Sequence, residues 1–160
     1  MAGARGRGVE RFRATLDEHG LADTIVELAA GARTADDAAA ALGCPAAAIV
    51  KSLVLAGAQA RALLVLGAGD GRLDEALVGA HAGGPVHLAD AGFVREVAGF
   101  AIGGVPPFGH ERALRTLVDE RILEQPRVWA AAGAPHALFS LAPTDLVAAT
   151  RGEVVAVGRP

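Results

Sequence analysis

Two short apolar segments on either side of a glycine-containing turn constrain the fold of this chain more than any other feature. Val50 to Ala56 and Ala60 to Leu66 are mostly aliphatic, and Gly57-Ala58-Gln59 lies between them. Aliphatic runs flanking such a turn are typical of a β-hairpin. The sequence therefore predicts an antiparallel pair of strands over these segments.

The first of these strands contains the only lysine of the chain, since 14 of its 15 basic residues are arginine. Because side chains alternate along a strand, Lys51 shares a face with Leu53 and Leu55, which are expected to point toward the core. Burying an ammonium group without an anionic partner is costly. Two interpretations stay open: Lys51 binds a phosphate or carboxylate at the edge of a cleft, or its stem follows the apolar surface and the ammonium reaches solvent.

Periodicity, capping residues and turn residues predict the other elements. The expected helices are 9–19, 34–43, 73–80, 90–99 and 144–150, and the expected further strands are 24–28, 85–89, 128–131, 137–141 and 154–157. Pro45 predicts a short helical turn. Residues 111–123 fit a helix or a strand.

The length of 160 residues predicts one domain over residues 1–160, with residues 1–8 as a disordered tail. A hydrophobic fraction of 52% excludes wholesale disorder, and no apolar run approaches the roughly 20 residues of a membrane span. The arginine-containing N-terminus is not followed by the apolar segment of a secretory signal. Cys44 is the only cysteine, which excludes an internal disulfide. These features predict a soluble cytoplasmic protein.

The net charge of −3 disfavours nonspecific binding to DNA or other long nucleic acid. Arg5, Arg7, Arg11 and Arg13 could form a local basic patch, but a solvated N-terminal tail is the favoured interpretation. The five histidines show no metal-ligand spacing, so no metal site is expected.

The segment from Gly103 to His110 contains two prolines and three glycines. Such a composition forbids regular structure. Glycines let backbone N–H groups face a ligand, and prolines fix the shape of a loop. This segment is either a preorganised binding loop, whose amides stabilise a developing oxyanion, or an ordinary connection.

A competing motif lies at Ala62 to Gly71, where a strand runs into a glycine-rich turn. This pattern resembles the first motif of S-adenosylmethionine-dependent methyltransferases, with Asp90 near the place of a ribose-binding acid. Only about 90 residues follow the turn, which is short for a doubly wound sheet. The methyltransferase is therefore kept only as a remote alternative.

Several motifs taken together resemble the YbaK/ProX family, the freestanding relatives of the editing domain inserted in bacterial prolyl-tRNA synthetases. The similarity runs from about residue 9 to residue 157, and its motifs are 34–39, 49–54, 100–110, 133–136 and 143–146. The most specific of them are the Lys51-Ser52 pair and the glycine/proline loop, in that order and separation.

The resemblance implies an α+β fold, in which a curved, barrel-like mixed β-sheet with flanking helices forms a single domain of the YbaK type. It also implies a trans-editing hydrolase that deacylates mischarged aminoacyl-tRNA, usually tRNA for proline carrying a small non-cognate amino acid. The expected partners are the acceptor end of the aminoacyl-tRNA and a prolyl-tRNA synthetase or an elongation factor. No cofactor and no metal are expected.

By the same resemblance, Lys51 holds the phosphate or ribose of the terminal adenosine, and the backbone amides of the loop from Gly103 to Pro107 bind the ester carbonyl. The catalytic residues implied are Lys51, Gly103 and Gly104. The substrate-binding residues implied are Ser52, Val105, Pro106, Pro107, Phe108, Gly109, His110, Gly133 and His136. Pro106 stands where many members carry serine or threonine, which puts the amino-acid specificity in question more than the reaction.

Ester hydrolysis of this kind needs positioning and oxyanion stabilisation, and the substrate's own ribose hydroxyl can act as the base. A triad or a metal is then unnecessary, and Lys51 and the 103–107 loop should converge on one hollow. The alternative is a non-catalytic module that binds tRNA or a synthetase. A pI of about 5.9 fits that module, because tRNA enzymes acting alone usually present a basic face.

Overall fold

The computed structural model describes residues 4–29 and 32–160, which fold as a single α+β domain. The largest sheet has five strands in the order β5-β2-β3-β6-β9, and β1-β8-β7 form a second sheet and β10-β4 a third. The strands are β1 (Val26–Glu27), β2 (Val50–Ala56), β3 (Ala62–Ala68), β4 (Arg72–Leu73), β5 (His87–Leu88), β6 (Arg115–Asp119), β7 (Val128–Ala131), β8 (Ala137–Leu141), β9 (Glu153–Val155) and β10 (Gly158–Arg159). The α-helices are α1 (Ala4–Glu18), α2 (Ala35–Leu42), α3 (Glu75–Ala82), α4 (Ala91–Ala98) and α5 (Pro143–Thr150).

The predicted hairpin is present as the antiparallel pair β2–β3, which the parallel strand β6 extends. Strand β3 begins two residues later than expected, because Gln59 and Ala60 have φ angles of 58° and 57°. That left-handed backbone is incompatible with a strand, and the connection forms a 3₁₀ turn at Ala58–Ala60 instead.

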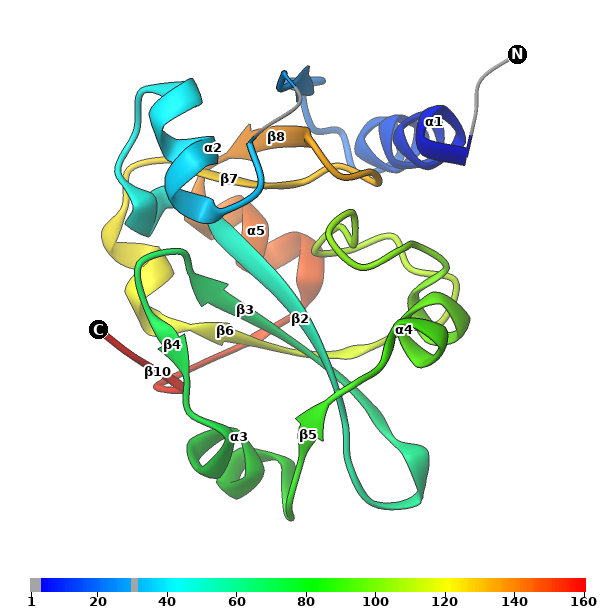
Figure 1. Cartoon of the computed structure of the whole chain (residues 1–160), viewed down its shortest axis with the longest axis vertical. Helices are drawn as coiled ribbons and strands as arrows, with labels where there is room; N and C mark the ends of the chain where they lie inside the picture. Colours follow the sequence, from blue (N-terminus) through cyan, green and yellow to red (C-terminus); the bar gives the residue numbers. More distant parts are fainter. Residues whose placement is uncertain (1–3, 30–31) are drawn as a thin grey trace.

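The five-stranded sheet buries an apolar surface on each of its faces. On one face Val50, Leu64 and Val118 pack against β7, β8, α1 and α5, and on the other Leu55 and Leu117 pack with α3 residues such as Val78. Figure 1 shows β7 and β8 on one side of the β2–β3 pair and α3 on the other. Strand alternation places Lys51 on the α3 side, together with Leu53 and Leu55, as the sequence predicts.

The α+β class with mixed strands is confirmed, but the sheets do not close into a barrel. The segment 111–123, which sequence left ambiguous, forms β6 followed by a 3₁₀ helix at Glu120–Glu124. Helix α3 begins later than predicted, because Asp74 caps it by accepting the N–H groups of Ala76 and Leu77. The two-stranded β4–β10 ladder was not predicted.

Helix α1 begins at Ala4, so residues 4–8 are helical and the prediction of a disordered tail is wrong for them; residues 1–3 lie outside the described part. The arginines of α1 serve local contacts rather than a free basic patch. Arg11 donates to the carbonyl of Gly99 at 2.8 Å and lies 4.3 Å over the Phe100 ring, while Arg13 pairs with Asp23 and Glu10. The side chain of Arg5 lies outside the described part.

None of the helices in residues 4–29 and 32–160 has the length and apolar character that crossing a membrane requires.

Candidate functional site

An open edge of β2 forms one wall of a cavity of about 310 Å³, called here the front cavity. Strand β5 pairs with β2 only at Leu55 and Ala56, so over residues 50–53 this edge has no ladder partner within the described part of the chain. The lining residues used below are Lys51, Ser52, Ile102, Gly103, Val105 and His136. The Lys-Ser pair, the glycine/proline loop and the 133–136 turn therefore meet at one place, although they are far apart in sequence.

The loop that contributes Gly103 and Val105 is pressed tightly onto the neighbouring turn. A Cβ added at Gly104 would lie 2.7 Å from the Cα of Ala134, so only glycine allows this approach. Gly103 has a φ of +89°, which glycine adopts without steric cost. These two glycines are thus explained by backbone geometry at the cavity wall.

The amide groups of this loop are not equivalent. The N–H of Gly104 donates to the carbonyl of Ala101 at 2.9 Å and is therefore engaged in a turn. Within residues 4–29 and 32–160, the N–H groups of Gly103 and Val105 have no hydrogen-bond acceptor. Of the loop amides expected to bind the ester carbonyl, those of Gly103 and Val105 are thus unengaged, whereas that of Gly104 is not.

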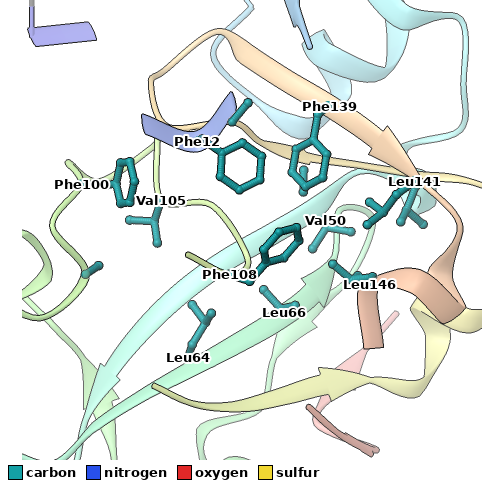
Figure 2. Packing of buried hydrophobic residues seen from close by; sticks show 14 of the residues in the cluster. Phe12, Val50, Leu64, Leu66, Phe100, Val105, Phe108, Phe139, Leu141 and Leu146 are labelled. Carbon is teal, nitrogen blue, oxygen red and sulfur yellow. The ribbon is translucent and has the colours of Figure 1, made fainter. Parts of the chain in front are cut away.

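The second half of the loop anchors it and does not line the front cavity. Phe108 is buried against Phe12 and Phe139, with ring centroids 5.3 and 5.9 Å apart (Figure 2). Gly109 has a φ of +83° and packs on Thr15 of α1. Pro106, Pro107, Phe108, Gly109 and His110 do not line the front cavity, and their predicted substrate contacts stay predictions.

His110 fixes the loop through its imidazole ring. Its Nε2 lies 2.6 Å from the carbonyl oxygen of Pro106, and burial lowers the pKa of His110. A neutral ring with its proton on Nε2 donates this hydrogen bond. His110 accordingly stabilises the conformation of the loop through its hydrogen bond to Pro106.

The 133–136 turn brings His136 to the cavity but keeps Gly133 away from it. His136 has a φ of 70°, and its Nδ1 lies 3.1 Å from the carbonyl oxygen of Ala32. A left-handed histidine is uncommon, and such backbone strain is found at functional sites. Gly133 instead lies directly against the backbone of Gly8 in α1 and does not line this cavity, and its substrate contact stays a prediction.

The hydroxyl of Ser52 is buried and, in the described part of the chain, has no hydrogen-bond partner. Leaving a buried hydroxyl unpaired costs roughly 1–3 kcal/mol. Ser52 lines the front cavity, but its Oγ is buried, so a bound molecule would reach the hydroxyl only if the cavity wall shifted.

Lys51 borders the front cavity, but its ammonium group points elsewhere. The Nζ donates to the carbonyl oxygen of Gly71 at 3.3 Å, on the opposite face of the sheet from Val105 and Phe108. The loop and Lys51 are expected from the sequence to converge on one hollow. Both line the front cavity, but the Nζ of Lys51 lies on the other face of the sheet. To bind a ligand in the front cavity, the ammonium group of Lys51 must break its hydrogen bond to Gly71 and reorient toward that ligand.

No group of three or more His, Cys, Asp or Glu side chains in the described residues is arranged to hold a metal ion. The one cysteine, Cys44, is partly buried, and burial raises the pKa of its thiol.

The structure is thus a mixed α+β domain with a cavity of about 310 Å³ at an open strand edge. The chain belongs to the aminoacyl-tRNA editing domain family, here the YbaK/ProX type, whose family model matches residues 29–149.

Known proteins of similar sequence and structure support this membership. A crystal structure described as a proposed trans-editing enzyme for prolyl-tRNA synthetase is 42% identical, with a TM-score of 0.90 over 96% of this chain and 98% of that one. The structure of hypothetical protein APE2540 is 32% identical, with a TM-score of 0.85 over 93% of this chain and 99% of that one. The uncharacterized protein YwhH of Bacillus subtilis (strain 168) is 27% identical over 122 residues, which cover 76% of this chain and 78% of YwhH.

The methyltransferase alternative is wrong. The strand of its motif, β3, pairs antiparallel with β2, and Asp90 caps helix α4 by accepting the N–H of Phe93 at 2.9 Å. This topology is the editing-domain fold and not a doubly wound parallel sheet.

Proposed function

We propose that the protein is a trans-editing deacylase that hydrolyses the ester of a mischarged aminoacyl-tRNA at the front cavity. The observation that carries the proposal is the set of unengaged hydrogen-bonding groups on one cavity wall: the Ser52 hydroxyl and the amides of Gly103 and Val105. Membership of the editing family and the similarity to a proposed trans-editing enzyme support it.

In the proposed reaction, a water oxygen attacks the ester carbonyl carbon while the neighbouring ribose hydroxyl relays a proton: it accepts one from the water and passes its own toward the ribose oxygen of the ester. The carbonyl oxygen becomes an oxyanion, which the N–H groups of Gly103 and Val105 stabilise. One such donor is typically worth about 2.7–4 kcal/mol of transition-state stabilisation. The bond between the carbonyl carbon and the ribose oxygen then breaks, and that oxygen receives the proton. The products are a free amino acid and an uncharged tRNA.

The remaining wall residues serve binding and orientation. We expect the ammonium of Lys51 to leave Gly71 and bind the phosphate or ribose of the terminal adenosine, because its backbone lies at the open edge of β2. We expect Ser52 and His136, which line the front cavity, to contact the substrate.

The substrate we propose is tRNA for proline carrying a small non-cognate amino acid. The net charge of −3 is compatible with a protein that contacts only the acceptor end of the tRNA. A prolyl-tRNA synthetase or an elongation factor would then deliver the tRNA. The histidine spacing supports a reaction that does not depend on a metal.

The test is hydrolysis of tRNA for proline charged with alanine, serine, threonine or cysteine, with correctly charged prolyl-tRNA as the control. We expect turnover of at least one mischarged species, undiminished by EDTA, and none of the control. Saturable tRNA binding without release of any of these amino acids would instead establish the non-catalytic binding module.

A further inference from the structure

A second cavity lies on the opposite face of the sheet, behind Lys51. This rear cavity, of about 310 Å³, is lined by Lys51, Gly67, Gly71, Leu73, Leu88 and Asp119, among others. It faces the α3 side of the sheet and is separated by β2 from the loop that forms the front cavity. Nothing in the proposed deacylation uses it.

Strand register sets the geometry of the rear cavity. Lys51 pairs with Gly67 across β2 and β3, and the parallel pairing of Leu66 with Val118 makes Asp119 the next neighbour of Gly67. Residues side by side on adjacent strands point to the same face, and neighbouring strands are about 4.8 Å apart. Lys51 and Asp119 therefore stand on the same face, on either side of Gly67.

Gly67 leaves the space between these two charged side chains open. A Cβ added there would meet no atom within 4 Å, and the backbone of Gly67 is not in the left-handed region. A side chain at this position would be tolerated sterically, which distinguishes Gly67 from Gly71, where an added Cβ would lie 2.8 Å from the carbonyl oxygen of Arg159. Backbone packing therefore does not require glycine at position 67, and the absence of a side chain there leaves the rear cavity open.

The two charged groups beside Gly67 have few partners of their own. Asp119 is 2% exposed, accepts the N–H of Arg121 at 3.3 Å and makes no ion pair in the described part of the chain. Its burial raises the pKa of the carboxyl group. Lys51 has three N–H donors, of which one is used on Gly71. A buried carboxylate and an ammonium with spare donors therefore face one cavity, whose wall also includes Arg72 and Glu75.

We propose that the rear cavity binds a free α-amino acid, with its ammonium at Asp119, its carboxylate at Lys51 and its side chain against Leu53 and Leu73. A small zwitterion complements both charges at once, whereas a simple anion or cation would satisfy one of them. Binding there requires no bond to form or break. If the proposed function holds, a released amino acid bound in the rear cavity would keep Lys51 on the rear face and thereby inhibit deacylation.

The test is titration of the full ¹⁵N-labelled chain with alanine, proline and the other proteinogenic amino acids, followed by amide chemical shifts. We expect saturable shifts at Gly67, Gly71 and Asp119 for at least one amino acid, and binding about tenfold weaker or absent for its N-acetyl and amide derivatives, which each lack one charge. Gly67→Val should abolish binding by filling the cavity while the chain stays folded. Gly84→Val, at another glycine with no atom within 4 Å of an added Cβ, is the matched control and should bind normally.

Asp119→Asn should weaken binding about tenfold by removing the charge that receives the ammonium. The proposal is overturned if no amino acid gives saturable shifts at millimolar concentration, or if the shifts persist unchanged in Gly67→Val. Because this titration contains no tRNA, its failure leaves the deacylase proposal standing, and failure of the hydrolysis assay leaves this binding site standing.

Discussion

The Nε2 atom of His110 lies 2.6 Å from the carbonyl oxygen of Pro106, and this hydrogen bond closes the glycine/proline loop from the side away from the front cavity. The loop thereby presents Gly103 and Val105 to the cavity while its second half stays in the core. An imidazole that adjoins a glycine/proline loop in sequence need not touch the substrate of that loop.

This contact predicts a pH dependence. Burial lowers the pKa of His110 in the folded protein, so the unfolded chain binds the proton more readily. The stability that the neutral ring contributes is complete above the unfolded pKa of about 6.5, and it is lost as the pH falls through the folded value. His110→Gln keeps an N–H donor and cannot titrate. We expect the wild-type protein to lose stability relative to this variant between pH 7 and pH 5, measured by urea unfolding.

His110→Ala provides the companion measurement at neutral pH. It removes the hydrogen bond to Pro106 and should cost roughly 0.5–1.5 kcal/mol of unfolding free energy. An unchanged pH profile in both variants would show that His110 does not titrate in the folded chain as proposed.

Removing the buried hydroxyl of Ser52 should affect stability and activity in opposite directions. Because its Oγ has no partner in the described residues, Ser52→Ala should leave stability unchanged or raise it by up to about 1 kcal/mol. If the hydroxyl binds substrate, kcat/KM for deacylation should fall about tenfold, which corresponds to roughly 1.4 kcal/mol. Thermal unfolding and steady-state hydrolysis measure the two effects.

Ser140 provides a matched control for that experiment. It is also a buried strand serine, but its Oγ accepts the Nε–H of Arg127 at 2.8 Å. Ser140→Ala should cost about 1.5–3 kcal/mol of stability, because a charged donor loses its acceptor, and should leave deacylation of the folded protein intact. A Ser52→Ala variant that is destabilised like Ser140→Ala, with full activity, would remove Ser52 from the site.

The close approach of Gly104 to the 133–136 turn predicts that deacylation depends on the position of the loop. Gly104→Ala would place a Cβ 2.7 Å from the Cα of Ala134, and the loop would have to move away. Overpacking of this kind costs roughly 1–3 kcal/mol, and the displaced amides should lower deacylation further than the stability loss alone. Gly84→Ala, with no atom within 4 Å of the new Cβ, should change neither quantity. Full activity in Gly104→Ala would show that the loop position is not limiting.

Local sequence patterns predicted what depends on neighbours along the chain. The β2–β3 hairpin, the capped helices α2 and α4, and the face of β2 that carries Lys51 follow from turn residues, caps and alternation. The family resemblance added the fold class and the set of segments that meet at the front cavity.

Long-range register and packing were not predictable in this way. The Lys51–Gly67–Asp119 row depends on the alignment of three strands, one of which sequence left ambiguous. The contact of Gly8 with Gly133 depends on where α1 docks, so local sequence carried no signal for it. Which amides of the loop are unengaged had no sequence signal, because the difference between Val105 and Gly104 depends on Gly104 donating to Ala101.

Deacylation of alanyl-tRNA for proline by wild-type protein, Lys51→Ala and Lys51→Arg, under single-turnover conditions, tests the central claim most directly. The account predicts that Lys51→Ala loses at least about a hundredfold in rate while its unfolding transition stays cooperative. Lys51→Arg should not restore the rate, because a planar guanidinium cannot replace a compact ammonium that reorients from Gly71 to the substrate. Hydrolysis by Lys51→Ala at the wild-type rate would contradict the account.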